Sequence, residues 1–197
     1  FEEISDSSLT RAGVIRNPDE QVGWQIVGAP GFDGQDNQAI FLNFYDYGAG
    51  LGERDLLYTP VYDFTELSEA ALSFRYAYAP YSEDGAISLD RLQVGLSRDC
   101  GATIDEIIFD AAGASLATVS PTNAPFEPDS RAEWRQVSFN LQDYIGDPNV
   151  QVVFTGINDF GNNLYLDDIN ITIDRAFELD IAIEEILLPA RLSCNNV

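Results

Sequence analysis

The chain has 197 residues and a formal net charge of −23 at pH 7, with no histidine, no methionine and 10 basic residues that are all arginine. Without histidine or lysine, it has no serine–histidine or cysteine–histidine nucleophile, no histidine-ligated zinc and no Schiff-base lysine. Its 33 acidic residues repel nucleic-acid phosphates and anionic lipid, and no apolar run approaches the roughly 20 residues of a membrane span, so we expect neither nucleic-acid binding nor membrane insertion.

Apolar residues at every second position predict a series of β-strands. In chain order, the expected strands lie at 23–27, 39–44, 56–62, 72–78, 92–96, 137–141, 150–154 and 169–173. Clusters of Gly, Pro, Asn and Asp separate them and predict turns, and at most a short helical turn is expected at 143–145. Short strands at this spacing are typical of an all-β sandwich.

A further alternating segment follows the last of these strands, with Leu179, Ile181 and Ile183 on one face and Pro189 after them. We therefore interpret residues 1–174 as one β-sandwich and 175–197 as a linker with the first strand of a following domain. Without the sheet of that domain, the apolar face of 179–183 has to pack on the sandwich or on another copy. We expect the chain to be a piece of a longer protein.

Several short motifs occur in a characteristic order. They are an initial FEE, Trp24, DG at Asp33, LLYTP from Leu56, LSFRYAY from Leu72, LQVGLS from Leu92, EWRQVSFNL from Glu133 and NNLYLDDINI from Asn162. Over residues 1–173 this order resembles the MAM-like jelly-roll family, and in particular the cleaved-adhesin-type domains of bacterial secreted proteases and surface proteins. Animal MAM domains carry cysteine pairs that this chain lacks, which favours the bacterial relatives.

The resemblance implies an all-β fold, a two-sheet antiparallel jelly-roll β-sandwich of the concanavalin-like or galactose-binding-like kind. It also implies secretion or attachment to the cell surface, no catalytic activity of its own, and an Ig-like domain after residue 174. The segment SRDCGATID resembles part of the bacterial domains, which implies that Cys100 belongs to the sandwich and Cys194 to its neighbour. Whether the two cysteines pair stays open.

A structural Ca²⁺ near the two ends of the chain is a further implication of the resemblance. The candidate ligands are Glu2, Asp33, Asp36, Asn37, Asp167 and Asp168. Strand parity supports Asp167, because it places this residue on the inward face, where a buried carboxylate needs a partner. The other members of that face are Tyr165, Ile169, Ile171 and Ile173. In the alternative, Asp167 accepts only backbone hydrogen bonds or an arginine, and Glu2 is a frayed terminus; Asp168 faces solvent.

Tyrosines beside glycine-rich or acidic loops are the candidate ligand contacts, namely Tyr45, Tyr47, Tyr78 and Tyr81. Aromatic side chains are common in binding sites, and here they could stack on a sugar; the alternative is that they anchor the core and its loops. Trp24 and Trp134 lie within strand patterns, so we expect both in the core. No pair of carboxylates is distinguished as a glycosidase pair.

From these features we expect a non-catalytic, calcium-stabilised accessory or adhesion module of a larger secreted or cell-surface protein. Its partners would be a protein or polysaccharide surface ligand and the neighbouring domains of the same polypeptide. One alternative is a carbohydrate-binding module, which would expose a row of aromatic side chains. Another is a structural subunit of a surface fibre, in which the strand at 179–183 completes the sheet of a neighbour.

Overall fold

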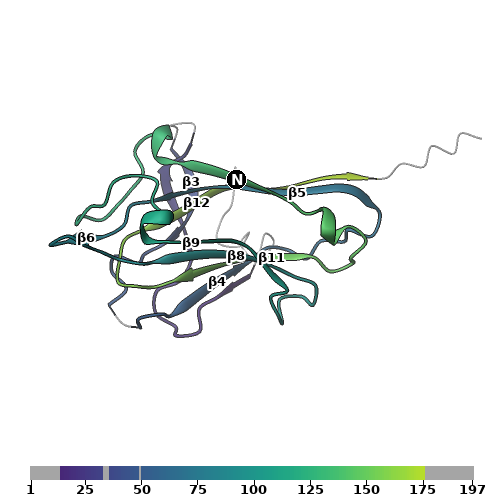
Figure 1. Ribbon diagram of the computed structural model, residues 1–197, viewed down its shortest axis with the longest axis horizontal. Helices are drawn as coiled ribbons and strands as arrows, with labels where there is room; N and C mark the ends of the chain where they lie inside the picture. Colours follow the sequence, from purple (N-terminus) through teal and green to yellow (C-terminus); the bar gives the residue numbers. More distant parts are fainter. Residues whose placement is uncertain (1–13, 33–35, 49, 176–197) are drawn as a thin grey trace, which may run out of the picture.

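A computed structural model describes residues 14–32, 36–48 and 50–175 of the chain. Two five-stranded sheets form two layers, and a two-stranded hairpin stands apart (Figure 1). The strand order is β1-β4-β11-β8-β9 in the first sheet, called sheet A, and β10-β5-β12-β3-β2 in the second, called sheet B. Figure 1 shows β6 of the hairpin at one tip of the molecule and the ends of β5 and β12 towards the other.

All strand pairs within the two sheets are antiparallel. Sheet A consists of β1 (Val14–Arg16), β4 (Arg54–Tyr58), β8 (Arg91–Ser97), β9 (Glu106–Ala112) and β11 (Gln151–Ile157). Sheet B consists of β2 (Gln25–Pro30), β3 (Asp36–Leu42), β5 (Leu67–Tyr78), β10 (Arg135–Asn140) and β12 (Leu164–Arg175). The hairpin is β6 (Ser82–Glu83) and β7 (Ala86–Ile87). The predicted all-β sandwich is confirmed.

Helical structure in the described part of the chain is limited to three single 3₁₀ turns, η1 (Gly113–Ser115), η2 (Arg131–Glu133) and η3 (Gln142–Tyr144). The last of these is the helical turn expected near 143–145. Each of the eight strands expected between residues 23 and 173 overlaps an observed strand, whereas β1, β6, β7 and β9 were not expected. The expected strand at 179–183 lies outside the described residues.

The main core fills the space between the sheets with side chains from both inner faces. Its largest fully buried members include Leu42, Phe44, Phe64, Leu72, Phe74, Leu92, Leu96 and Phe154. A smaller cluster lies on the outer face of sheet B and consists of Ala29, Ala39, Ala77, Ala79, Phe126, Trp134 and Tyr165. The small alanine side chains leave room on the strands for the two large rings of Phe126 and Trp134. Trp24 and Trp134 are 3% and 6% exposed, as expected for core residues.

A β-bulge divides β12 into two halves of opposite parity. Its register against β5 shifts between Asp167 and Asn170, and Asp168 has a positive φ of 47°. Before the bulge, Leu166 belongs to the main core and Tyr165 to the outer cluster; after it, Ile169 packs on the main core. The inserted residue exchanges the two faces, so the expectation that Tyr165 and Asp167 share the inward face with Ile169 is wrong. Asp167 is nevertheless buried, at 3% exposure.

Candidate functional site

The predicted calcium ligands are only partly within the described structure. Glu2 and Asp33 lie outside it, and of Asp36 and Asn37 it describes the backbone, at the start of β3. Asp167 uses Oδ1 to accept a hydrogen bond of 2.7 Å from the backbone N–H of Asp168. The structure thus brings two of the six candidates together, both on β12. Among the described residues, no group of three acidic, cysteine or histidine side chains could hold a metal ion.

An arginine stands beside these two aspartates. Arg75 on β5 pairs with Asp167 in the sheet register and forms an ion pair with the carboxylate of Asp168. Its guanidinium lies 3.6 Å from the centroid of the Phe32 ring, and Nη2 donates to Gln136 Oε1 at 3.2 Å. A metal ion bound by Asp168 would therefore compete with Arg75. The calcium site at the chain ends stays a prediction that depends mainly on Asp167.

The four candidate tyrosines separate into two groups. Tyr47 and Tyr78 are buried, at 1% and 0% exposure, so they anchor the core, as the alternative interpretation has it. Tyr45 is 36% exposed and Tyr81 is half-buried. The rings of Tyr45 and Tyr81 meet edge to face, with centroids 6.1 Å apart and an angle of 64° between their planes. Of the four, only this pair can contact a ligand at the surface.

A surface hollow of about 360 Å³ lies beside Tyr81. It is lined by Tyr81, Glu83, Asp84, Ala86, Ile87, Ser88, Asp159 and Phe160, which come from the β6–β7 hairpin and its flanks and from the loop after β11. Phe160 and Ile87 are 48% and 42% exposed. Apolar rings beside carboxylates and a hydroxyl can stack on a ligand and accept hydrogen bonds from it. We call this set, together with Tyr45, the hairpin surface.

A buried carboxylate holds the loop that carries Phe160. Asp90, which is 0% exposed, lies directly before β8. Its Oδ1 accepts from the backbone N–H groups of Asp159 at 2.7 Å and Gly161 at 3.1 Å, and its Oδ2 accepts from the N–H of Asn162 at 2.8 Å and from the hydroxyl of Tyr78 at 2.9 Å. Burial raises the pKa of Asp90 to about 6, although these hydrogen bonds act in the opposite direction. Asp90 therefore fixes one wall of the hairpin surface.

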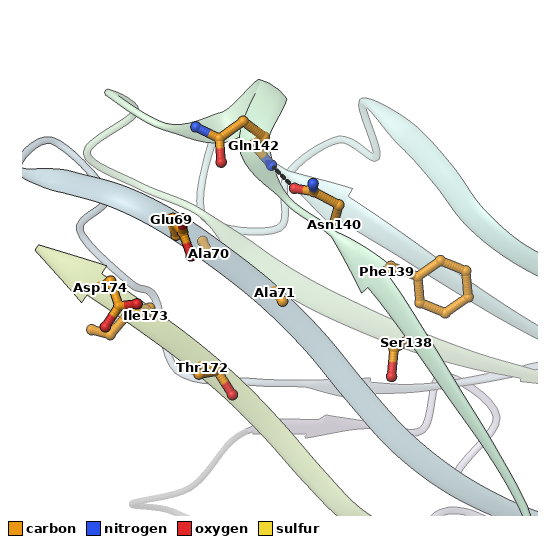
Figure 2. Close-up of a pocket in the computed structure, with 10 residues that line it drawn as sticks. All are labelled: Glu69, Ala70, Ala71, Ser138, Phe139, Asn140, Gln142, Thr172, Ile173 and Asp174. Carbon is orange, nitrogen blue, oxygen red and sulfur yellow. Dashed lines mark hydrogen bonds between the residues drawn. The ribbon is translucent and has the colours of Figure 1, made fainter.

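A second hollow, of about 380 Å³, lies over β5, β10 and β12 of sheet B. Figure 2 shows its lining residues, Glu69, Ala70, Ala71, Ser138, Phe139, Asn140, Gln142, Thr172, Ile173 and Asp174. The small side chain of Ala71 lies between its cross-strand partners Asn140 and Thr172. A hydrogen bond of 2.7 Å from the Gln142 backbone N–H to Asn140 Oδ1 closes one end (Figure 2). The single ring among the lining residues, Phe139, packs on the main core. This hollow offers hydrogen bonds and little stacking.

Sequence reasoning did not find Phe160 or Asp90. Phe160 lies in NDFGNN, which predicts a turn, and an aromatic residue inside such a turn was the available signal. Cys100 is exposed on the turn after β8, and its candidate partner Cys194 lies outside the described residues, so their pairing stays open. The helices found in the described part are too short and too polar to cross a membrane.

Comparison with solved structures finds this fold in cleaved adhesin domains of Lys-gingipain. The K1 domain from Porphyromonas gingivalis W83 aligns with a TM-score of 0.57 and 17% identity over 87% of this chain and 93% of that chain. The K3 domain from the same organism gives 0.54 and 16% over 81% and 90%, and the K2 domain of Lys-gingipain gives 0.52 and 17% over 82% and 88%. No family model matches the chain, and no curated protein matches its sequence. The chain has the cleaved-adhesin-type jelly-roll fold that its ordered motifs predicted.

Proposed function

We propose that the chain is a non-catalytic accessory module that attaches a larger secreted or cell-surface protein to a polysaccharide ligand. The observation that carries this proposal is the hairpin surface, where Tyr45, Tyr81 and Phe160 expose aromatic rings beside acidic side chains. The fold shared with cleaved adhesin domains supports a role as an adhesion module. The chain also lacks the histidine and lysine that many catalytic mechanisms require.

The chemistry of the hairpin surface favours a neutral sugar. Glu83 accepts a hydrogen bond of 3.2 Å from the Tyr81 hydroxyl, and Asp159 accepts one of 2.6 Å from the backbone N–H of Leu89. Both carboxylates are thus held in place by their own loops and keep further lone pairs for ligand hydroxyls. Because the chain carries a net charge of −23, an acidic polysaccharide would be repelled.

Binding of immobilised glycans, with single substitutions on the hairpin surface, tests this proposal. Tyr81→Ala and Phe160→Ala should each weaken retention on the bound glycan about tenfold, because each removes a stacking ring. Val61→Ala is a matched control, because Val61 is 43% exposed and lies far from the hairpin surface. The next residue, Tyr62, pairs with Val150, which precedes β11, whereas Phe160 follows β11. The proposal is contradicted if Val61→Ala reduces retention as much as the other two variants do. It is also contradicted if the wild type retains no glycan.

The structural Ca²⁺ at the chain ends is a second part of the proposal. Its support is the burial of Asp167, whose carboxylate lies at the strand that precedes the end of the described chain. There the ion would be held by Asp167 together with Glu2 and the 33–37 loop, and it would stabilise the fold by linking these segments. Asp167→Asn should then lower the calcium-dependent part of the melting temperature.

The surface-fibre alternative depends on residues 179–183, which lie outside the described structure. Light scattering of the chain with and without the residues after Ile173 tests it, because strand addition between copies would produce larger particles only when those residues are present.

A further inference from the structure

A second buried aspartate stands in a different environment from that of Asp90. Asp55, the second residue of β4, is 0% exposed. Both of its carboxylate oxygens are shielded from solvent, and neither accepts a hydrogen bond of good geometry from a described residue. The Tyr47 hydroxyl lies near enough to act on the carboxylate, but it donates to Asp19. The indole N–H of Trp24 lies close by but donates to the backbone oxygen of Asp55, at 2.9 Å. A buried carboxylate without partners costs several kcal/mol, so this one calls for a ligand or a proton.

The groups that act on Asp55 are acids and a phenol. Asp19, from the turn before β2, accepts a hydrogen bond of 2.7 Å from the hydroxyl of Tyr47. Burial, and then the negative charge of Asp19, raises the pKa of Asp55 to about 7. The nearby hydroxyl of Tyr47 acts in the opposite direction, and Glu53 adds a smaller rise. Burial, followed by the hydrogen bond to Asp19, also raises the pKa of Tyr47, and Asp55 adds to this effect. The buried Asp55 carboxylate and Tyr47 phenol thus lie beside the half-buried carboxylate of Asp19.

No positive charge compensates these acids within the described structure. The ion pairs found there join Arg75 to Asp168, Arg91 to Asp110 and Arg98 to Asp147. The turn that holds Asp19 contains one more shielded oxygen, Asn17 Oδ1, which has no hydrogen-bond partner in the described part of the chain. Asn17 Nδ2 donates to the backbone oxygen of Gln21 at 3.3 Å.

We propose that Asp55 and Asp19, with the Tyr47 hydroxyl beside them, bind one hard divalent cation of the Ca²⁺ type. Carboxylate and neutral oxygens are the donors that Ca²⁺ prefers, and it accepts an irregular arrangement of them. The ion would balance the buried charge of Asp55 and link the turn at 17–23 to β4 in sheet A. This site is separate from the one predicted at Asp167, which lies on sheet B, and it does not depend on glycan binding.

Thermal unfolding in metal-free buffer at pH 8, with and without 2 mM CaCl₂, tests the proposal. Calcium should raise the melting temperature of the wild type by roughly 5 °C, and Asp55→Asn and Asp19→Asn should lose most of this rise. Without metal, Asp55→Asn should be at least as stable as the wild type, because it removes an uncompensated charge. That result shows that the variant folds, so its lost calcium response reflects a lost site. Asp110→Asn is the control and should keep the full rise, because it removes an exposed carboxylate that pairs with Arg91 and belongs to neither site.

Tb³⁺ luminescence gives an independent measurement, because an ion bound at Asp55 would lie near Trp24 and Tyr47 and be sensitised by them. Emission should drop at least fivefold in Asp55→Asn and stay within twofold of the wild type in the control Asp110→Asn. The proposal is overturned if Asp55→Asn keeps the full calcium response, if only Asp167→Asn loses it, or if the wild type responds to protons alone. Glycan retention by Asp55→Asn reports separately on the hairpin surface.

Discussion

Asp90 and Asp55 are both 0% exposed, and each lies at the start of a strand in sheet A, yet their surroundings differ completely. Asp90 accepts hydrogen bonds from three backbone N–H groups and one hydroxyl. Asp55 has no such partner among the described residues. Burial alone therefore does not reveal the role of an acid. Where the chain supplies the donors, the acid organises a loop; where it supplies none, the position is suited to a cation.

The largest expected change in stability is for Asp90, the aspartate whose oxygens are all hydrogen-bonded. Asp90→Ala should lower the free energy of unfolding by about 4 kcal/mol, because it leaves three backbone N–H groups and the Tyr78 hydroxyl buried without an acceptor. Urea unfolding followed by tryptophan fluorescence measures this loss. Ser115→Ala, which removes a hydroxyl that bonds within its own 3₁₀ turn, is a control that should cost about 1 kcal/mol. A loss for Asp90→Ala no larger than the control would refute the anchoring role.

For Asp55, the change in the free energy of unfolding should have the opposite sign. Asp55→Asn in metal-free buffer at pH 8 should raise the free energy of unfolding by about 2 kcal/mol, since it replaces a buried charge by a neutral group of equal size. The matched Asp90→Asn should lower it, because the new NH₂ group would face backbone donors. Urea unfolding of the two variants in parallel measures both signs. Equal signs would show that the two aspartates are equivalent.

The comparison also predicts a pH dependence. The pKa of Asp55 in the folded chain is raised to about 7 from an ordinary 3.8, so folding favours its protonated form. Its contribution to stability is complete below about pH 3.8 and is lost as the pH rises through about 7. Between pH 6 and 8, the free energy of unfolding of the metal-free wild type should therefore fall by about 1 kcal/mol relative to that of Asp55→Asn. Equilibrium unfolding at both pH values checks this, and parallel curves for the two proteins would contradict the burial of an ionisable Asp55.

The smallest effect is expected for an acid at the surface. The Asp110 carboxylate pairs with Arg91, and the two side chains are 36% and 43% exposed. Asp110→Asn should cost about 0.5 kcal/mol at low salt and nothing measurable in 1 M NaCl, because solvent and ions screen an exposed pair. Unfolding at the two salt concentrations measures the difference. A cost that persists at high salt would place this pair among the buried interactions instead.

Much of the fold follows from alternation in the sequence. In β5, residues 72–78 place every second side chain in the main core, and the same holds for 92–96 in β8. The strand β9 escaped prediction because Ile107, Ile108 and Phe109 follow one another without alternation. Its partner β8 also shifts register between Val94 and Gly95. Three residues in β1 are too few for any pattern.

The candidate sites were harder to predict, although part of the signal was present. Asp55 alternates with Leu57, and Asp90 alternates with Leu92, so parity alone would have placed both carboxylates towards the core. The sequence could not tell which of the two carboxylates is hydrogen-bonded, because the three backbone donors to Asp90 come from a loop about 70 residues away. Parity failed for Asp167 because a bulge cannot be seen in the pattern of a single strand.

That bulge has a consequence for how the sheet assembles. Because the two halves of β12 point their apolar side chains to the core with opposite parity, the strand fits β5 only where the extra residue lies between Asp167 and Asn170. A slip by one residue would turn both halves outward. A slip by two residues would move the bulge along the strand, so that one residue beside it faces the wrong side of the sheet. An apolar side chain would then be exposed, or a polar one buried. The extra residue at Asp168 therefore fixes the register, and β5 and β12 can pair in one alignment.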